Sequence, residues 1–302
     1  MADALANLLI SRLHSLQQQR TTWESHWQEI ADFVVPRKAD VTKVRSSGDK
    51  RAELIFDGTA IHAAELMSAS LHGMLTSSAT SWFSLRYNDD DLNGDDEAME
   101  WLQSVEDVMY KAFNRSNFQE QIHELYHDLI TFGTAVMFIE KDEETQLRFS
   151  TRHIKECYLS EDDRGRVDTV FRKFKMPVRA AMKRFGSEKM SSKILKKAEK
   201  DPYEMITLLH CVYERDDRDI TKLTSDNKPY ASVYIEPEEK IVLSEGGFDE
   251  NPYTCPRFLK SSFEIGYGRS PSMTALADIK MLNRMSEVTI RAAQKQVDPP
   301  LL

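Results

Sequence analysis

The sequence predicts an α+β protein in which helices accompany a mixed, mostly antiparallel sheet and a long helix follows near the C-terminal end. Two observations lead to this fold class. Apolar residues recur every three or four positions before residue 36, from about 95 to 132, and after 270. Between about 134 and 243, runs such as FRKFKM alternate apolar and polar residues, as strands do. A chain of 302 residues with 41% hydrophobic content can bury a substantial core.

The composition excludes several classes of protein. The 49 acidic and 40 basic residues leave a net charge of -9, so any contact with DNA must be local or weak. The cysteines Cys157, Cys211 and Cys255 are far apart and form no C-x-x-C pair, which is typical of inert thiols in a reducing compartment. No apolar run approaches the roughly 20 residues of a membrane helix, and the N-terminus lacks a secretion-signal pattern. We therefore expect a soluble, non-secreted protein.

The first element is an amphipathic helix, continuous or broken near Gln19, which ends before Pro36. Its apolar stripe consists of Leu5, Leu9, Leu13, Leu16, Trp23, Trp27 and Ile30. From Arg37 to Arg51 the sequence turns polar and basic, which predicts an exposed loop. We expect the four lysines and arginines between these two ends to be solvated.

The second helix is predicted to be capped by Asp57 or Thr59 and to end at Leu75, before the helix-breaking segment TSSATS. Residues 82–87 alternate as a short strand, and an acidic turn follows at 89–97. The next helix, at about 95–113, has negative charges in its first turn, which favour its start. It is expected to bury Trp101, Leu102, Val105, Val108 and Met109.

Helices and strands alternate in the middle of the chain. A helix is expected at about 118–132, then a strand in GTAVMFIE and further strands between 147 and 176. Pro177 begins a helical, lysine-rich stretch to about 200, and strand character returns at 205–213 and 231–243. Gly246 and Gly247 indicate a turn after the last strand, and not a phosphate-binding loop.

The last helix carries the most information. Ser270 is its predicted N-cap, Pro271 its first residue, and Asp298 to Pro300 end it after about Val297. At about 100° per residue, one narrow strip collects Lys280, Arg284, Glu287, Arg291 and Lys295, a formal charge of +3. The rest of the helix is apolar or small: Ile279, Met281, Leu282, Met285, Val288, Ile290, Ala292, Ala293 and Val297. Such a helix is either enclosed by neighbouring subunits or further chain, or is a core helix with one solvated edge.

Four stretches of the sequence resemble, in order, a known family. They are WESHWQEIADFVVPR near Trp23, FDGTAIHAAELMSASLHGMLTSSATSWFSL near Phe56, SNFQEQIHELYHDLITFGTAVMF near Ser116, and YGRSPSMTALADIKMLN from Tyr267. All four are similar to podovirus-type head-to-tail connector (portal) proteins of bacteriophages. The resemblance covers essentially the whole chain and implies that the family's architecture continues beyond residue 302.

The resemblance implies a division of the chain and a set of partners. Residues 1–268 would form a wing-like α+β domain, 269–298 the first stem helix and 299–302 the start of the clip. The clip proper, tunnel loop and crown would be absent. The chain would form a dodecameric ring at one capsid vertex, at the head-to-tail junction of the virion, after assembly in the host cytoplasm. Double-stranded DNA would pass through the ring during packaging and ejection, and terminase, tail adaptor, scaffold and capsid proteins would bind it.

The same resemblance implies a protein without chemistry, cofactor or metal. The sequence has no G-x-x-x-x-G-K-[ST] phosphate loop, so ATP hydrolysis would belong to a partner. If the last helix lines a channel, its four cations could contact phosphates weakly and without sequence preference, while Glu287 pairs with Arg291. Alternatively, these charges form salt bridges between neighbouring stem helices. The expected subunit packing face is Ile279, Leu282, Met285, Val288, Ala292 and Ala293.

Two rival hypotheses remain open on the sequence. His123, Glu124 and His127 spell H-E-x-x-H, the spacing of a zinc-dependent hydrolase, but they lie at the polar margin of their helix and no convincing third ligand is present. The other rival is a structural adaptor that does not form rings. The acidic cluster of Asp89, Asp90, Asp91, Asp95 and Asp96 is interpreted as a solvated turn and not as a metal site.

Overall fold

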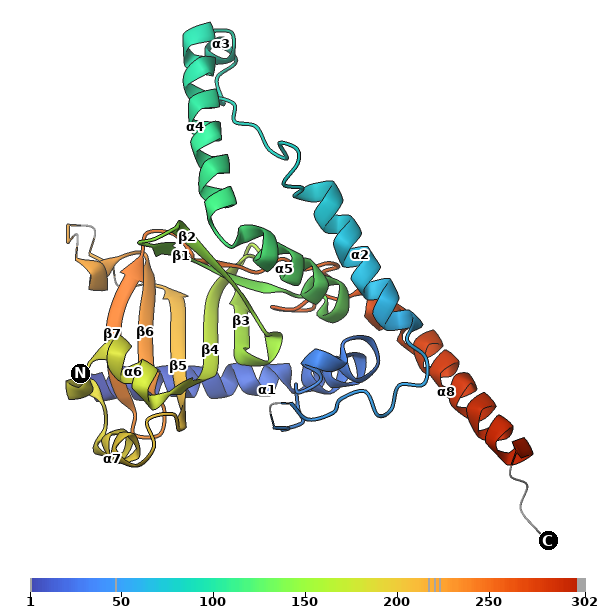
Figure 1. Cartoon of the computed structure of the whole chain (residues 1–302). Coiled ribbons are helices and arrows are strands. Elements are labelled where there is room, and N and C mark those ends of the chain that lie inside the picture. The colour runs from blue at the N-terminus through green and yellow to red at the C-terminus, as the bar shows by residue number, and fades with distance from the viewer. Residues whose placement is uncertain (1, 47, 217, 220, 223, 298–302) are drawn as a thin grey trace. The chain divides into compact units, whose positions relative to one another are not determined.

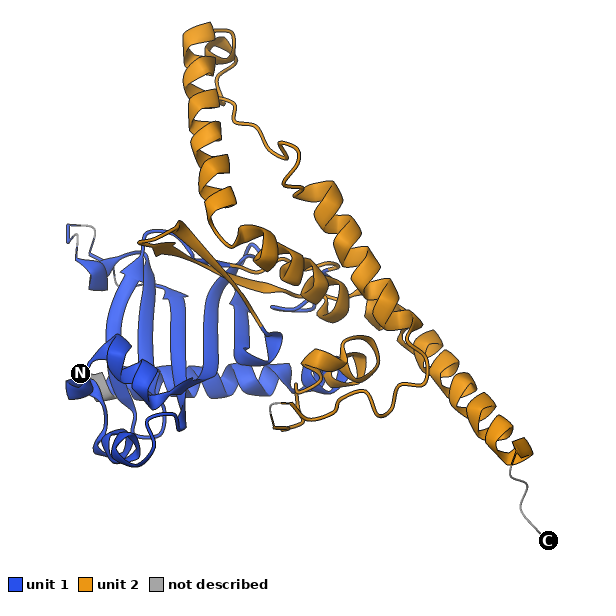
Figure 2. Cartoon of the chain, in the orientation of Figure 1, with its two compact units in different colours: residues 1–27, 153–253, 260–267 blue, residues 28–152, 254–259, 268–302 orange. Residues whose placement is uncertain are grey.

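The structure is a computed structural model that describes residues 2–46, 48–216, 218–219, 221–222 and 224–297. The chain folds into two compact units, which Figure 2 distinguishes by colour. Unit 1 consists of residues 1–27, 153–253 and 260–267, and unit 2 of residues 28–152, 254–259 and 268–302. The division into a wing-like domain and a stem helix at residue 268 stays a prediction, and the predicted clip start at 299–302 lies outside the described residues.

Unit 1 is built on an antiparallel sheet with the strand order β3-β4-β5-β6-β7. The strands are β3 (Cys157–Glu161), β4 (Val167–Pro177), β5 (Met205–Glu214), β6 (Tyr230–Glu236) and β7 (Ile241–Phe248). Short 3-10 helices span Ile154–Glu156, Ser187–Lys189 and Ser225–Asn227. The predicted strand at 231–243 is therefore two strands, β6 and β7. The predicted turn at Gly246 and Gly247 was wrong, because both glycines lie in β7 and pair with residues of β6.

Helices cover both faces of this sheet. Because side chains alternate along a strand, Phe171 and Leu209 lie on one face, where they pack against Leu9 and Leu13 of α1 (Ala2–Val34). On the other face, Leu208 packs against α6 (Val178–Phe185) and α7 (Ser192–Lys200), the two helices of the lysine-rich stretch. Figure 1 shows α1 running across the strands.

The helix α1 is continuous through Gln19, so a break there is ruled out. The reason is Arg20, which is only 1% exposed although its neighbours are polar. Its guanidinium donates to the carbonyl oxygens of Ile154 (2.8 Å) and Cys157 (2.6 Å) and to the carboxylate of Glu24 (2.6 Å). A polar residue thus belongs to the core side of the helix because four groups in unit 1, the three named and the carbonyl of Lys155, satisfy its donors.

Unit 2 combines helices with a small sheet of order β2-β1-β8. Its helices are the 3-10 helix Pro36–Lys38, α2 (Thr59–Leu75), α3 (Asp90–Asn93), α4 (Asp96–Arg115), α5 (Phe118–Phe132) and α8 (Pro271–Val297). The strands are β1 (Val136–Asp142), β2 (Gln146–Arg152) and β8 (Tyr253–Thr254), with β1 and β2 antiparallel. The core between the helices contains Ile30, Val34, Ala64, Ile130 and Leu276.

Two predictions for the segment 82–113 were wrong. Residues 82–87 are extended but form no strand among the described residues, because side chains bind their backbone: the Tyr110 hydroxyl accepts from Phe83 N (2.8 Å) and Glu106 accepts from Leu85 N (3.1 Å). In α4 only Leu102 is buried, whereas Trp101 and Val108 are 60% and 61% exposed.

The basic loop after α1 is also less solvated than expected. Lys43 pairs with Asp32 (2.6 Å), Arg45 with Asp40 (3.3 Å), and Lys38 with the buried Asp128. The loop is thus held to its unit by ion pairs.

The α+β class and the long C-terminal helix are confirmed. The sheet is not a single mixed one, since the strands form two separate sheets and the pairs described in detail are antiparallel. Among the described residues, no helix combines the length and apolar content that crossing a membrane requires.

Candidate functional site

The candidate site is the surface of α8, and its first turn is firmly attached to the end of α5. Ser270 caps α8 as predicted: its hydroxyl accepts from Met273 N (3.0 Å) and donates to the carbonyl oxygen of Thr131 (2.8 Å). Ser272 donates to the carbonyl of Ile130 (3.0 Å). Both carbonyls belong to the last turn of α5, where backbone oxygens lack helical partners. The start of α8 therefore supplies the missing donors of α5.

Gly133 allows this close approach. It ends α5 with a φ of 76°, and a Cβ atom there would lie 2.3 Å from the carbonyl oxygen of Gly268. No side chain fits at that distance, so the segment that leads into α8 can pass directly over the end of α5 at Gly268 only because residue 133 is glycine.

The middle of α8 is held by Asn283, a buried residue whose importance the sequence did not reveal. Its Oδ1 accepts from the backbone N–H groups of Phe56 (2.7 Å) and Asp57 (3.2 Å), and its Nδ2 donates to the carbonyl of Leu54 (2.9 Å). The amide thereby fixes the loop before α2 to α8. A signal that could have found it was helical geometry: Asn283 lies close to Leu276 and Ile279 around the helix, and an amide beside apolar residues needs hydrogen-bond partners.

Beyond its first turns, α8 has three faces. The face toward the rest of unit 2 carries the buried Asn283 and Glu287 and the half-buried Ile279. At about 100° per residue, the predicted charged strip lies next to it and shares Glu287 with it. Of the exposed apolar residues, Met281, Met285, Val288 and Ala292 lie roughly opposite, and Leu282 and Ala293 lie at the side. Figure 1 shows the C-terminal half of α8 extending beyond the other elements of its unit.

The charged strip is a chain of ion pairs. Lys280 pairs with Glu29 of α1, while Arg284 (2.5 Å) and Arg291 (2.6 Å) both pair with Glu287. The Glu287 side chain is only 12% exposed, whereas the two arginines remain about two thirds exposed. Lys295 has no ion pair within the part of the chain that the structure describes. The strip is therefore partly neutralised, and its positive charge lies mainly toward the C-terminal end.

The apolar face consists of Met281, Leu282, Met285, Val288, Ala292 and Ala293, all exposed in this chain. Met285 and Val288 are 59% and 51% exposed. Of the predicted packing residues, Ile279 lies elsewhere, since it packs inward against the cluster around Ile30 and Val34. A continuous apolar stripe on a projecting helix is typical of a surface that another element covers.

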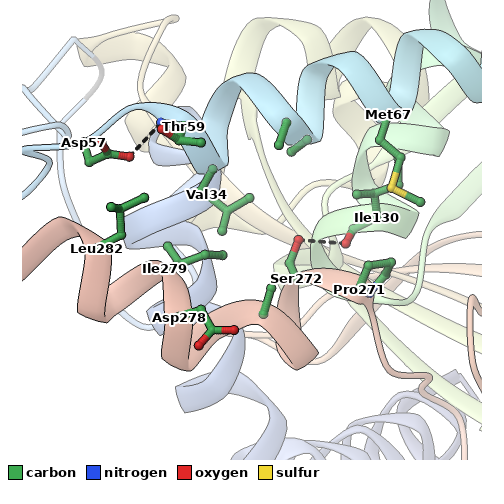
Figure 3. A pocket seen from close by; sticks show the side chains of 14 residues that line it. Val34, Asp57, Thr59, Met67, Ile130, Pro271, Ser272, Asp278, Ile279 and Leu282 are labelled. Carbon is green, nitrogen blue, oxygen red and sulfur yellow. Dashed lines mark hydrogen bonds between the residues drawn. The ribbon is translucent and has the colours of Figure 1, made fainter.

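A cavity of about 300 Å³ lies beside this helix within unit 2, between α8, α2, α5 and the end of α1. Figure 3 shows Val34, Met67, Ile130, Ile279 and Leu282 around it, with Asp278 at its margin. Its wall is mostly apolar, and its polar lining residues are Asp57, Thr59, Ser272 and Asp278.

In the H-E-x-x-H motif, the glutamate Glu124 takes part in ion pairs. Glu124 accepts two hydrogen bonds from Arg37 (2.8 and 2.9 Å) and pairs with Lys38 (2.5 Å). These cations hold the pKa of Glu124 at about 2, against the opposing effect of burial. A general base held in this way is a poor proton acceptor near neutral pH.

Two side chains near Glu124 on α5 also have shifted pKa values. Burial, with Arg37 and Lys38 nearby, lowers the pKa of His127 to about 4, and burial raises the pKa of Asp128 to about 6. Among the described residues, no three His, Cys, Asp or Glu side chains are grouped as metal ligands would be. Nothing in this site supports the zinc-hydrolase alternative.

Comparison with known proteins identifies the family. Residues 6–302 match the family described as bacteriophage head to tail connecting protein. The portal protein of Salmonella phage epsilon15 is 32% identical over 306 residues, which cover 100% of this chain and 55% of that protein. The probable portal protein of Bordetella phage BPP-1 is 32% identical over 298 residues, which cover 97% of this chain and 54% of that protein. The chain spans about half the length of these relatives. Because the family match extends over nearly all of its residues, the chain belongs to the bacteriophage head-to-tail connecting proteins.

Proposed function

We propose that this chain is a portal subunit: it forms a ring at one capsid vertex, and double-stranded DNA passes through that ring during packaging and ejection. The observation that carries the proposal is the exposed apolar face of α8, in a chain whose relatives are named portal proteins. The family match had been expected from the four resembling stretches.

The geometry of α8 favours contacts between copies. One side of the helix already packs on its own unit through Asn283 and Glu287, and the apolar face points roughly the other way. In a ring, each subunit would cover the apolar face of the next one, and every copy would use the same pair of surfaces. All the apolar faces would then be removed from water, and no subunit would be left with an uncovered face. The packing residues at that interface would be Leu282, Met285, Val288, Ala292 and Ala293.

The charged strip fits a conduit that holds DNA weakly. Phosphate binding becomes tighter with each free cation that approaches the duplex. In α8, Arg284 and Arg291 share Glu287 and Lys280 is paired with Glu29, so few charges are free to bind phosphate. A strip of this kind permits sliding. The alternative assignment, ion pairs between neighbouring stem helices, uses the same residues.

The remaining parts of the proposal follow from the family. The protein would act as a structural component of the virion at the head-to-tail junction, without catalysis or cofactor, after assembly in the host cytoplasm. The ring would be dodecameric. Terminase would dock on it during packaging and the tail adaptor afterwards, with scaffold and capsid proteins around it.

Electron microscopy of the negatively stained full-length gene product tests the proposal. We expect closed rings with a central channel, and a purely monomeric preparation would refute it. Phage particles whose portal subunit carries Arg291→Glu and Lys295→Glu distinguish the two roles of the strip, contact with DNA and ion pairs between neighbouring helices. If the strip faces DNA, packaged DNA is retained less well as salt is raised; if it joins helices, ring assembly fails first.

A further inference from the structure

A second unpartnered surface lies on α4. Trp101, Val105 and Val108 recur three or four residues apart and therefore share one face of the helix. Trp101 and Val108 are more than half exposed, and Figure 1 shows α4 projecting from its unit with α3 at the tip. A tryptophan on a projecting helix is an anchor typical of protein interfaces.

The charge around this stripe defines the partner. From residue 89 to residue 107 the chain carries nine carboxylates and no basic residue: Asp89, Asp90, Asp91, Asp95, Asp96, Glu97, Glu100, Glu106 and Asp107. Within the described ranges none of the nine forms an ion pair. A partner must therefore offer apolar groups surrounded by positive charge, since like charges at an interface are strongly unfavourable.

The chain itself presents such a surface on unit 1. From Arg179 to Lys200, across α6 and α7, there are eight basic and two acidic residues, a formal charge of +6. Next to them Tyr203 and Met205 are 66% and 50% exposed, and Arg179 donates to the Tyr203 hydroxyl (3.2 Å). Four of these lysines have no ion pair in the part of the chain that is described: Lys183, Lys189, Lys196 and Lys200.

We propose that the α3–α4 arm of one copy docks on the α6–α7 surface of a second copy. The inference rests on the proposed ring function and names one contact within it. Trp101 and Val108 would pack against Tyr203 and Met205, while the carboxylates of the arm face the lysines. Because the two surfaces differ, the contact is head-to-tail, the kind that closes rings when the rotation between copies allows it.

Two charge-reversed variants and their mixture test this contact. The arm variant carries Asp90→Lys, Asp91→Lys, Glu97→Lys, Glu100→Lys and Asp107→Lys, which change the formal charge of the arm from -9 to +1. The surface variant carries Lys183→Glu, Lys189→Glu, Lys196→Glu and Lys200→Glu, which change the formal charge of the surface from +6 to -2. Each variant alone opposes like charges, so the concentration for half-maximal assembly in sedimentation velocity should rise by about tenfold or more. In an equal mixture each arm meets a surface of opposite sign, so assembly should return to within about threefold of wild type.

The control variant Glu53→Lys, Glu143→Lys, Glu144→Lys, Asp163→Lys, Glu250→Lys makes the same change in net charge as the arm variant on exposed residues elsewhere and should assemble like wild type. Circular dichroism checks that each variant is folded. A mixture that assembles no better than its components would overturn the contact. So would rescue only when all nine changes are in one chain, because the contact would then lie within a copy. If wild type and both variants form rings equally well, only the arm contact is wrong; a monomeric wild type overturns the ring as well.

Discussion

Replacing Arg20 with methionine is expected to destabilise unit 1 more than replacing any exposed polar residue of α1. The side chain is buried and donates five hydrogen bonds: two to Glu24, and one each to the carbonyls of Ile154, Lys155 and Cys157, at 2.6 to 3.0 Å. Its guanidinium carbon also lies 3.8 Å from the ring centre of Tyr158. Methionine fills part of the volume but supplies no donor.

The magnitude follows from these contacts. Each buried carbonyl that loses its donor costs about 1 to 3 kcal/mol, and the cation–π contact adds about 1 kcal/mol. Methionine regains part of this by packing, so we expect a loss of about 3 to 5 kcal/mol, the range seen when one partner of a buried pair is removed. Arg20→Lys keeps the charge but not the planar fork, so its expected loss is about 2 kcal/mol.

Urea unfolding followed by tryptophan fluorescence measures these losses, since Trp27 lies close to the Arg20 side chain. Arg12→Met is the matched control, because Arg12 is an exposed arginine of the same helix. It should cost less than about 1 kcal/mol. If Arg20→Met and Arg12→Met cost the same, the burial and bonding of Arg20 do not stabilise the fold as argued.

Three further predictions concern unit 2. Asn283→Ala should cost about 2 kcal/mol and speed hydrogen exchange of the Phe56 and Asp57 amides, while Gln294→Ala should change neither; unchanged exchange would contradict the proposed link. Gly133→Ala should cost about 2 kcal/mol or more by thermal unfolding, because the Cβ atom overlaps the Gly268 carbonyl and φ is positive; a neutral result would refute this close approach. Glu124→Gln should cost about 1 to 2 kcal/mol at pH 7. The folded pKa of Glu124, about 2, is below its usual 4.5, so this stabilisation exists above pH 4.5 and is lost as the pH falls toward 2. Urea unfolding at pH 7 and near pH 2 checks this. If wild type and Glu124→Gln differ in free energy of unfolding by the same amount at the two pH values, the reasoning is contradicted.

Periodicity predicted the helices well where one side of them is apolar. The bounds of α5 and the end of α2 agree with the structure, and Ser270 caps α8 as expected. The prediction was wrong at Gln19, where a run of polar residues indicated a break in the first helix. A buried arginine is indistinguishable from a solvated one in sequence, because its burial depends on carbonyls from residues 154–157, which are remote along the chain.

The same limit applies to the candidate site. The strip from Lys280 to Lys295 follows from helical geometry alone, and ion pairs join three of its residues, Arg284, Glu287 and Arg291. Which side of α8 faces its own unit does not follow, because that depends on the loop bound by Asn283. Ile279 was therefore grouped with Met285 and Val288, although it packs inward with Ile30 and Val34. The alternating apolar and polar residues at 82–87 led to a wrong strand prediction for a related reason. The side chains of Tyr110 and Glu106 accept hydrogen bonds from backbone N–H groups that would otherwise need a neighbouring strand.

The central claim is that the exposed face of α8 joins copies of this chain. Native mass spectrometry of the wild-type protein, of Met285→Lys with Val288→Lys, and of the control Gln294→Lys tests it directly. We expect closed oligomers for wild type and control, and folded monomers or open fragments for the double variant, because two charges cannot be buried unpaired in an apolar interface. Closed oligomers of the double variant, as abundant as those of wild type, would contradict the claim.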